Sequence, residues 1–159
     1  SPSPNTGCAN SSLNMPGSNE PVWVLDTNVV LDLWHFDDPV ARPLRHAVDT
    51  GRVRCAASAA TFGEWQRVLA YPEFGLDAAR QLALQEAYRA ACVFPSAPTV
   101  PGVPRCADGD DQKFLDLAAA LRVPLVSKDR KVLKLRRAGR SGFAVLTPLE
   151  AVRWLQACT

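Results

Sequence analysis

Acidic side chains at four well-separated points of the chain are candidates for one shared site. They are Asp26, Glu64, Asp111 and Asp129. Asp26 directly follows the apolar run 22–25, and Asp129 comes shortly after the run 123–127. Such runs are typical of strands that are buried on both faces of a parallel sheet. Because open α/β sheets bind ligands at the carboxyl ends of their strands, the pattern predicts that Asp26 and Asp129 open on one cleft.

The other two acidic residues are expected on helices. Asp111 lies near the start of an expected helix, and its neighbours three, four and seven positions later are apolar, so it lies on the inward-facing stripe. Asp108 and Asp110 crowd the same helix start, and the sequence leaves open which of the three is the primary ligand. Glu64 flanks the packed face of its own helix. Glu64 is a candidate because the other three carboxylates are expected in the same site.

Four carboxylates in one cleft have a definite chemical meaning. Carboxylates packed together repel one another, and at least one pKa rises unless a cation is present. Mg²⁺ and Mn²⁺ prefer oxygen ligands, and a bound ion can activate water or stabilise the oxygens of a phosphodiester. The competing interpretations are structural: Asp26 as a helix cap, Asp129 as a solvated turn residue and Glu64 as a surface glutamate.

Alternating strands and helices must position these side chains. We expect strands at 22–25, 53–57, 93–94, 123–127 and 143–146. We expect helices at 28–36, 39–50, 58–70, 77–92, 110–122 and 131–137, and a last helix from Pro148. The order predicts a three-layer α/β domain with a mainly parallel central sheet.

Length and composition agree with one globular domain. The chain has 159 residues, of which 47% are hydrophobic and 21% charged. Residues 1–20 are rich in Ser, Asn, Pro and Gly, so we expect a disordered lead before a domain at 21–159. The five cysteines are scattered and include no Cys-x-x-Cys pair, which favours a reducing, cytoplasmic setting over a zinc site. No apolar run is long enough for a membrane span, so no membrane partner is expected.

The segments around the acidic residues resemble a known family. They read Val24-Leu25-Asp26-Thr27-Asn28, then Glu64, then Asp110-Asp111-Gln112-Lys113-Phe114-Leu115, and finally Leu125-Val126-Ser127-Lys128-Asp129. In this order they resemble a PIN-domain ribonuclease over about residues 22–150, and the branch of bacterial toxin components related to VapC is the most similar. One departure is Ser127, where the family often carries Thr, but serine keeps the hydroxyl.

The resemblance implies a fold, an activity and a set of partners. It implies the PIN fold, a Mg²⁺ or Mn²⁺ cofactor and hydrolysis of single-stranded RNA. It places metal-binding and catalytic roles on Asp26, Glu64, Asp111 and Asp129. Asn28 and Ser127 are the supporting polar residues. An antitoxin protein is the expected protein partner, and the chain could also assemble as a homo-oligomer.

A basic segment follows the second aspartate-bearing strand. Its candidate RNA-binding residues are Lys128, Arg130, Lys131, Lys134, Arg136 and Arg137. We expect them to hold RNA phosphates and to make binding depend on salt. The alternative is a solvated helix face.

Three other functions compete with the ribonuclease hypothesis. A haloacid-dehalogenase-like phosphatase would need a second aspartate two residues after Asp26, where this chain has Asn28. A non-catalytic PIN-like module that binds RNA or a protein would not need the complete acidic quartet. A nucleotide-binding α/β domain would be expected to carry a Gly-rich phosphate loop, and none is found.

Overall fold

A parallel five-stranded sheet forms the centre of the protein. The computed structural model describes residues 20–135 and 143–158. The strands are β1 (Val22–Leu25), β2 (Arg54–Ala56), β3 (Cys92–Val93), β4 (Leu125–Val126) and β5 (Val145–Leu146). Their order is β3-β2-β1-β4-β5, and every neighbouring pair is parallel. The predicted three-layer α/β class is confirmed.

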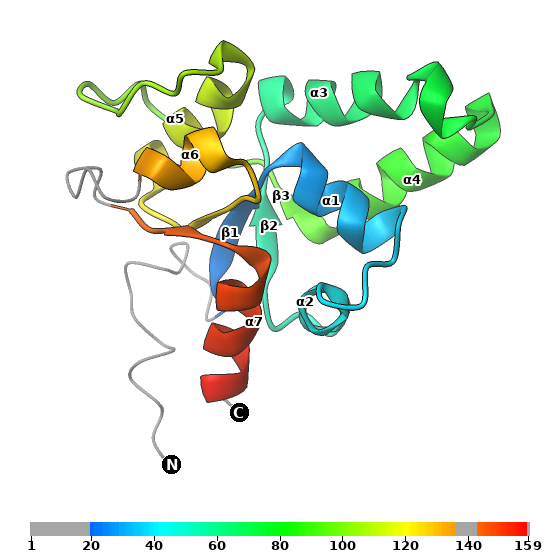
Figure 1. The fold of residues 1–159 in the computed structure, drawn as a ribbon, viewed down its shortest axis with the longest axis horizontal. Coiled ribbons are helices and arrows are strands. Elements are labelled where there is room, and N and C mark those ends of the chain that lie inside the picture. Colours follow the sequence, from blue (N-terminus) through cyan, green and yellow to red (C-terminus); the bar gives the residue numbers. More distant parts are fainter. Residues whose placement is uncertain (1–19, 136–142, 159) are drawn as a thin grey trace.

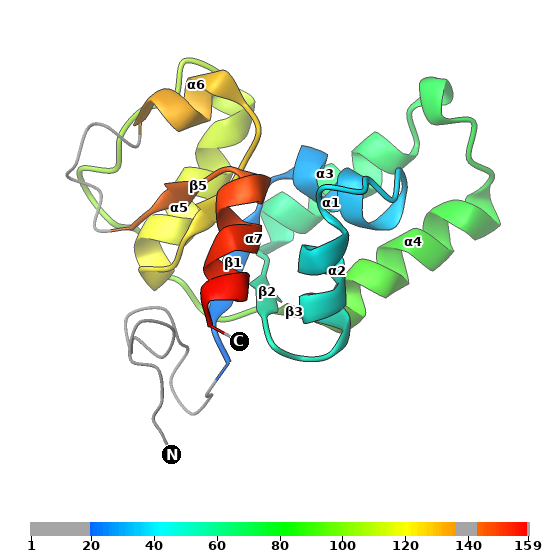
Figure 2. The same ribbon diagram turned by 60° about the horizontal axis from the view of Figure 1, so that its bottom comes forward.

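Helices cover both faces of this sheet. The α-helices are α1 (Thr27–Trp34), α2 (Arg42–Asp49), α3 (Ala59–Leu69), α4 (Ala78–Ala91), α5 (Gln112–Leu121), α6 (Arg130–Leu133) and α7 (Pro148–Ala157). Two 3-10 turns, η2 (Pro72–Phe74) and η3 (Gly109–Asp111), precede α4 and α5. Figure 1 shows α5 and α6 on one side of the sheet and α1 to α4 on the other. Helix α7 packs against α2, which Figure 2 shows from below. Within the described residues, no helix has the length and apolarity to cross a bilayer.

The sequence of β1 explains why this strand is central. Its four residues are all buried. Trp23 and Leu25 join the core formed with α1 to α4 and α7. Val22 and Val24 join the core formed with α5 and α6. Because successive side chains of a strand point to opposite faces, an unbroken apolar run can serve both cores.

Strand β1 is also the place where the chain reverses the direction in which it adds strands. From β1 the chain adds β2 and β3 on one side, and it returns to add β4 and β5 on the other. Asp26 follows β1, and its backbone N–H donates to the Val126 carbonyl of β4 at 3.0 Å. The first predicted aspartate therefore lies at the switch point, where open α/β sheets bind ligands.

The region of 110–122 differs from the expected single helix. Residues 109–111 form the turn η3, and α5 begins at Gln112, so Asp111 lies just before the helix. The helix ends at Arg122, which is in the left-handed conformation with φ of 57°. Strand β4 is shorter than the expected 123–127 and begins after Pro124, which has no N–H group to donate to a neighbouring strand.

Other boundaries shift by a few residues. Helix α6 begins at Arg130, because the Asp129 side chain accepts a hydrogen bond from the Lys131 N–H and caps it. The predicted helix at 131–137 extends beyond the described residues, so Arg136 and Arg137 lie outside them. The predicted lead at 1–20 also lies outside, except for Glu20.

The left-handed residue at the end of α5 gives a testable expectation. An arginine in this conformation carries a steric cost that glycine avoids. Arg122→Gly should therefore raise the free energy of unfolding by about 0.5–1 kcal/mol, measured by urea denaturation. Arg122→Ala keeps the Cβ atom and should give no gain. An equal gain from both variants would show that loss of the arginine side chain, and not relief of the backbone, is the cause.

Candidate metal centre

Three aspartates meet beside the carboxyl ends of β1 and β4. Asp108, Asp111 and Asp129 each offer one carboxylate oxygen, and these oxygens all lie within 4.8 Å of one another. Asp108 caps η3 by accepting from the Asp110 N–H at 3.0 Å, and Asp129 caps α6. Two local caps thus hold two of the carboxylates. All the ligand atoms are hard oxygens, a donor set that suits Mg²⁺ or Mn²⁺.

Asp111 has a buried carboxylate oxygen whose charge is not compensated by a hydrogen bond from a described residue. Its Oδ2 atom is buried and has no hydrogen-bond partner among the described residues. Burial raises the pKa of Asp111 to about 7, and the nearby Asp129, Asp26 and Asp108 carboxylates add to the rise. A buried acceptor that faces other acceptors is costly unless a proton or a cation lies between them. The three aspartates therefore fit a divalent cation.

Asp26 lies beside this group and is fixed from several directions. It is 3% exposed, and its Oδ1 atom accepts from the Val29 N–H at 3.2 Å, which caps α1. The Ser127 hydroxyl donates to its Oδ2 atom. Burial raises the pKa of Asp26 to about 6 against these hydrogen bonds, which lower it. The charge of Asp129 contributes a smaller rise.

Ser127 connects the two predicted strand-end aspartates. It is fully buried; its hydroxyl O–H donates to Asp26, and its oxygen accepts from the Asp129 N–H at 3.0 Å. Asp26 and Asp129 therefore open on one side of the sheet, as the strand pattern predicts. Asn28, the other supporting residue, has an exposed side chain, and its contact with Asp26 is made by its backbone N–H.

Glu64 is near the others but is bound to different partners. Its Oε2 atom accepts from the Thr27 hydroxyl at 2.6 Å. Its Oε1 atom accepts from the Lys113 ammonium at 2.6 Å. Lys113 also donates to the Asp110 carbonyl. Its role as a metal ligand stays a prediction, because the carboxylate is part of an ion pair in this structure.

Sequence reasoning left one of these contributors undecided and did not identify another. The choice among Asp108, Asp110 and Asp111 was left open, and the turn η3 brings the Asp108 carboxylate to Asp111. Lys113 contacts Glu64, which is 49 positions away in the chain, so local spacing carries no sign of the pair. A lysine two positions after Asp111, between Gln112 and Phe114, was the signal that the sequence offered.

The described part of the basic segment follows the site. Lys128 pairs with the buried carboxylate of Asp32 on α1 at 2.7 Å, so its charge is partly neutralised. Arg130, Lys131 and Lys134 are exposed on and after α6. Figure 1 shows α6 beside α5, on the side of the sheet opposite α1 and α3. Arg130 and Lys131 directly follow Asp129 in the chain, so this exposed basic segment begins next to one of the three aspartates.

The two raised pKa values predict how stability depends on pH without metal. In the folded state Asp26 and Asp111 have pKa values of about 6 and about 7, above their ordinary 3.8. Between about pH 4 and about pH 7 the folded protein therefore binds more protons than the unfolded chain, and these groups favour the unfolded chain increasingly as pH rises. Urea denaturation in a chelator should show this loss, which Asp111→Asn should reduce and Mn²⁺ should reverse in the wild type. A loss of equal size in Asp111→Asn would assign it to other groups.

Comparison with known proteins agrees with this geometry. A model of the PIN domain family matches residues 22–131, a span that contains all four predicted acidic residues. No curated protein matches the chain. One similar solved structure is a chain in the crystal structure of VapBC2 from Rickettsia felis bound to a DNA fragment from their promoter. The TM-score is 0.55 at 11% identity, over 79% of this chain and 98% of that chain, so the two share a fold. The chain belongs to the PIN domain family, whose members are nucleases.

Proposed function

We propose that this protein is a metal-dependent endoribonuclease that hydrolyses single-stranded RNA. The observation that carries the proposal is the buried, unpartnered Oδ2 atom of Asp111 among the Asp108 and Asp129 carboxylates. This arrangement is costly for a protein without a cation and useful for one that binds a cation. The PIN family match supports the nuclease class.

Each residue of the candidate site has a separate proposed role. Asp111 and Asp129, with Asp108, would hold a Mg²⁺ or Mn²⁺ ion, and Asp26 would contribute its charge from the adjoining switch point. When bound, such an ion supplies an activated water and neutralises charge on the phosphodiester oxygens. Ser127 would fix the position of the Asp26 carboxylate relative to the turn at Asp129 through its two hydrogen bonds. The Glu64–Lys113 pair places an ammonium group at the rim of the site.

The proposal extends to the biological setting. We propose that the protein is the toxin component of a toxin–antitoxin system, acting in the cytoplasm with an antitoxin as its protein partner, and that it can form a homo-oligomer. The likeness in fold to a chain of the VapBC2 complex supports this part. The basic residues after β4 support RNA as the substrate, because exposed lysines and arginines next to a cation site hold phosphates on both sides of the bond to be cleaved.

The catalytic part is tested at Asp111. Asp111→Asn keeps the shape of the side chain but removes a ligand charge, so it should lower turnover more than about tenfold, which corresponds to about 1.4 kcal/mol in the barrier. The measurement is cleavage of a labelled single-stranded RNA in Mn²⁺. The neighbouring Asp110→Asn is the matched control, since Asp110 is exposed and does not belong to the group of three. Full wild-type activity in excess chelator would reject metal dependence, and equal losses in both variants would reject a special role for Asp111. No cleavage by the wild type in Mn²⁺ would favour the non-catalytic module.

The RNA-binding part is tested at α6. Replacing Arg130 and Lys131 with Ala should weaken RNA binding and flatten its log–log salt dependence by about one to two units, because two phosphate contacts are lost. Anisotropy titrations in chelator at several salt concentrations measure this slope without cleavage. Arg80 and Arg153, exposed on α4 and α7, provide a control pair with the same change in net charge. An equal change of slope in the control pair would mean that the segment has no special role.

A further inference from the structure

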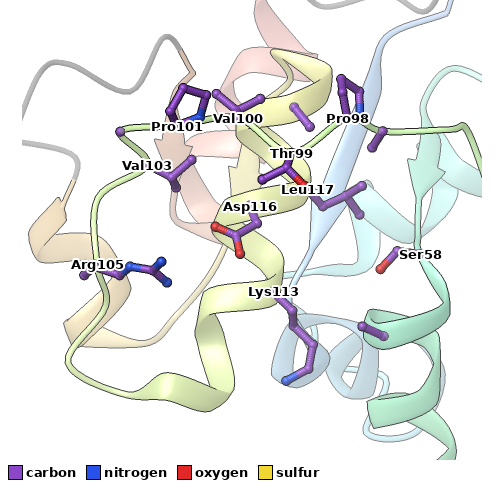
Figure 3. A pocket seen from close by; sticks show the side chains of 14 residues that line it. Ser58, Pro98, Thr99, Val100, Pro101, Val103, Arg105, Lys113, Asp116 and Leu117 are labelled. Atoms are coloured by element: carbon purple, nitrogen blue, oxygen red, sulfur yellow. The ribbon is translucent and has the colours of Figure 1, made fainter.

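A second feature lies beside the candidate metal centre, on the outer side of α5. It is a cavity of about 670 Å³ between the start of α3, the loop 97–105 and α5 (Figure 3). Part of its wall is apolar and comes from the loop residues Pro98, Val100, Pro101 and Val103 and from Leu117 of α5. A cavity of this size and composition is typical of a small-molecule or nucleotide subsite.

Three charged side chains lie in the lining, together with the hydroxyls of Ser58 and Thr99. The charged residues are Arg105, Lys113 and Asp116. Figure 3 shows the Asp116 carboxylate between α5 and the loop, with the Arg105 guanidinium directed toward the same space. Asp116 is the single acidic residue among those that line the cavity. A carboxylate with an arginine and apolar walls around the same space is suited to an anionic ligand that also carries an apolar ring with N–H donors.

The cavity and the carboxylate site share Lys113. This lysine lines the cavity, and its ammonium group contacts Glu64 at 2.6 Å and the Asp110 carbonyl next to Asp111. A ligand in the cavity is therefore one side chain away from the candidate metal centre.

The Asp116 carboxylate is held in place before any ligand arrives. Its Oδ1 atom accepts from the Gln112 Nε2 group at 3.0 Å. The same amide group donates to the Pro104 carbonyl at 3.1 Å, and Gln112 Oε1 accepts from the Cys106 N–H at 2.8 Å. Gln112 thus ties the loop to α5 and orients Asp116, while Asp116 Oδ2 accepts no hydrogen bond from the described residues. A fixed acceptor of this kind favours selective binding, because little ordering is left to the ligand.

We propose that the cavity binds a guanine base of the RNA substrate and that Asp116 determines this preference. The inference rests on the ribonuclease proposal and adds to it a base specificity. Guanine is the RNA base whose Watson–Crick edge presents two adjacent N–H donors, from N1 and the 2-amino group, to one carboxylate. The apolar wall packs against the faces of the ring, and Arg105 and Lys113 lie where the attached phosphates can reach them.

Binding without cleavage tests the specificity directly. Short oligouridylates that contain one guanosine, one adenosine or one inosine are titrated with the full chain in chelator, with anisotropy as the readout. Inosine lacks only the 2-amino group. The wild type should bind the guanosine oligomer at least about fivefold more tightly than the other two, as expected for loss of one arm of a paired contact. Asp116→Asn should bind all three with nearly the same affinity.

Two further variants separate specificity from folding and from charge. Ala60→Trp places a large ring in the cavity from the exposed face of α3 and should abolish the guanosine preference. Ala83→Trp, on the exposed face of α4, is the matched control and should retain it. Thermal unfolding of each variant identifies any loss of the fold. Retention of the preference in Ala60→Trp would overturn the proposal.

The remaining outcomes are equally decisive. If the wild type shows no preference among the three oligomers, or if Asp116→Asn changes all three affinities by one factor, the cavity is not a guanine subsite. In that case the apolar wall would be a candidate contact for a protein partner. Cleavage of the same oligomers in Mn²⁺ reports separately on the ribonuclease proposal. Cleavage without base preference would reject this inference alone, and guanosine-selective binding without cleavage would reject the activity alone.

Discussion

The buried hydroxyl of Ser127 is the contact on which the site depends. It donates to Asp26 and accepts from the Asp129 N–H, so one atom sets the relative positions of the residues that end β1 and cap α6. This contact exists only because β1 and β4 pair in parallel, with Leu25 opposite Val126. A shift of that register by one residue would turn Asp26 toward the other face of the sheet. The two apolar cores, which β1 joins with alternate side chains, prevent such a shift.

Burying these carboxylates close together is unfavourable, and the pKa values of two of them show it. Burial raises the pKa of Asp26 and Asp111, and the negative charges of neighbouring aspartates raise each pKa further. Hydrogen bonds from Ser127 and Val29 offset part of the cost at Asp26, whereas Asp111 Oδ2 has no such partner among the described residues. Unequal compensation of this kind points to the place where a cation is needed. Structural stability alone would not maintain an uncompensated carboxyl group at that position.

The sequence was informative where local rules determine the outcome. An apolar run followed by an aspartate predicted β1 and the direction of Asp26, because strand period acts within a few residues. The helix cap at Asp26, first considered as an alternative to a site residue, is present as well. The position of Asp111 was predicted only in part, since a 3-10 turn replaces the first turn of the expected helix. Contacts that join distant segments were not predictable. The pairing of Lys113 with Glu64, and the ties from Gln112 to the loop, depend on how α5 packs against α3 and on the path of residues 97–106.

Helix α5 shows how one short segment can serve three purposes at once. Phe114, Leu115 and Ala118 fill the core against β1 and β4. The residues just before the helix carry Asp108 and Asp111, and the polar side carries Gln112, Lys113 and Asp116. Because the apolar stripe fixes the rotation of the helix about its axis, it fixes the directions of these polar side chains as well. The outer cavity and the inner carboxylates are thus positioned by the same packing, but they use different side chains. Substitutions at Asp116 can therefore alter what the cavity accepts without moving Asp111, a separation that a loop-borne site would not provide.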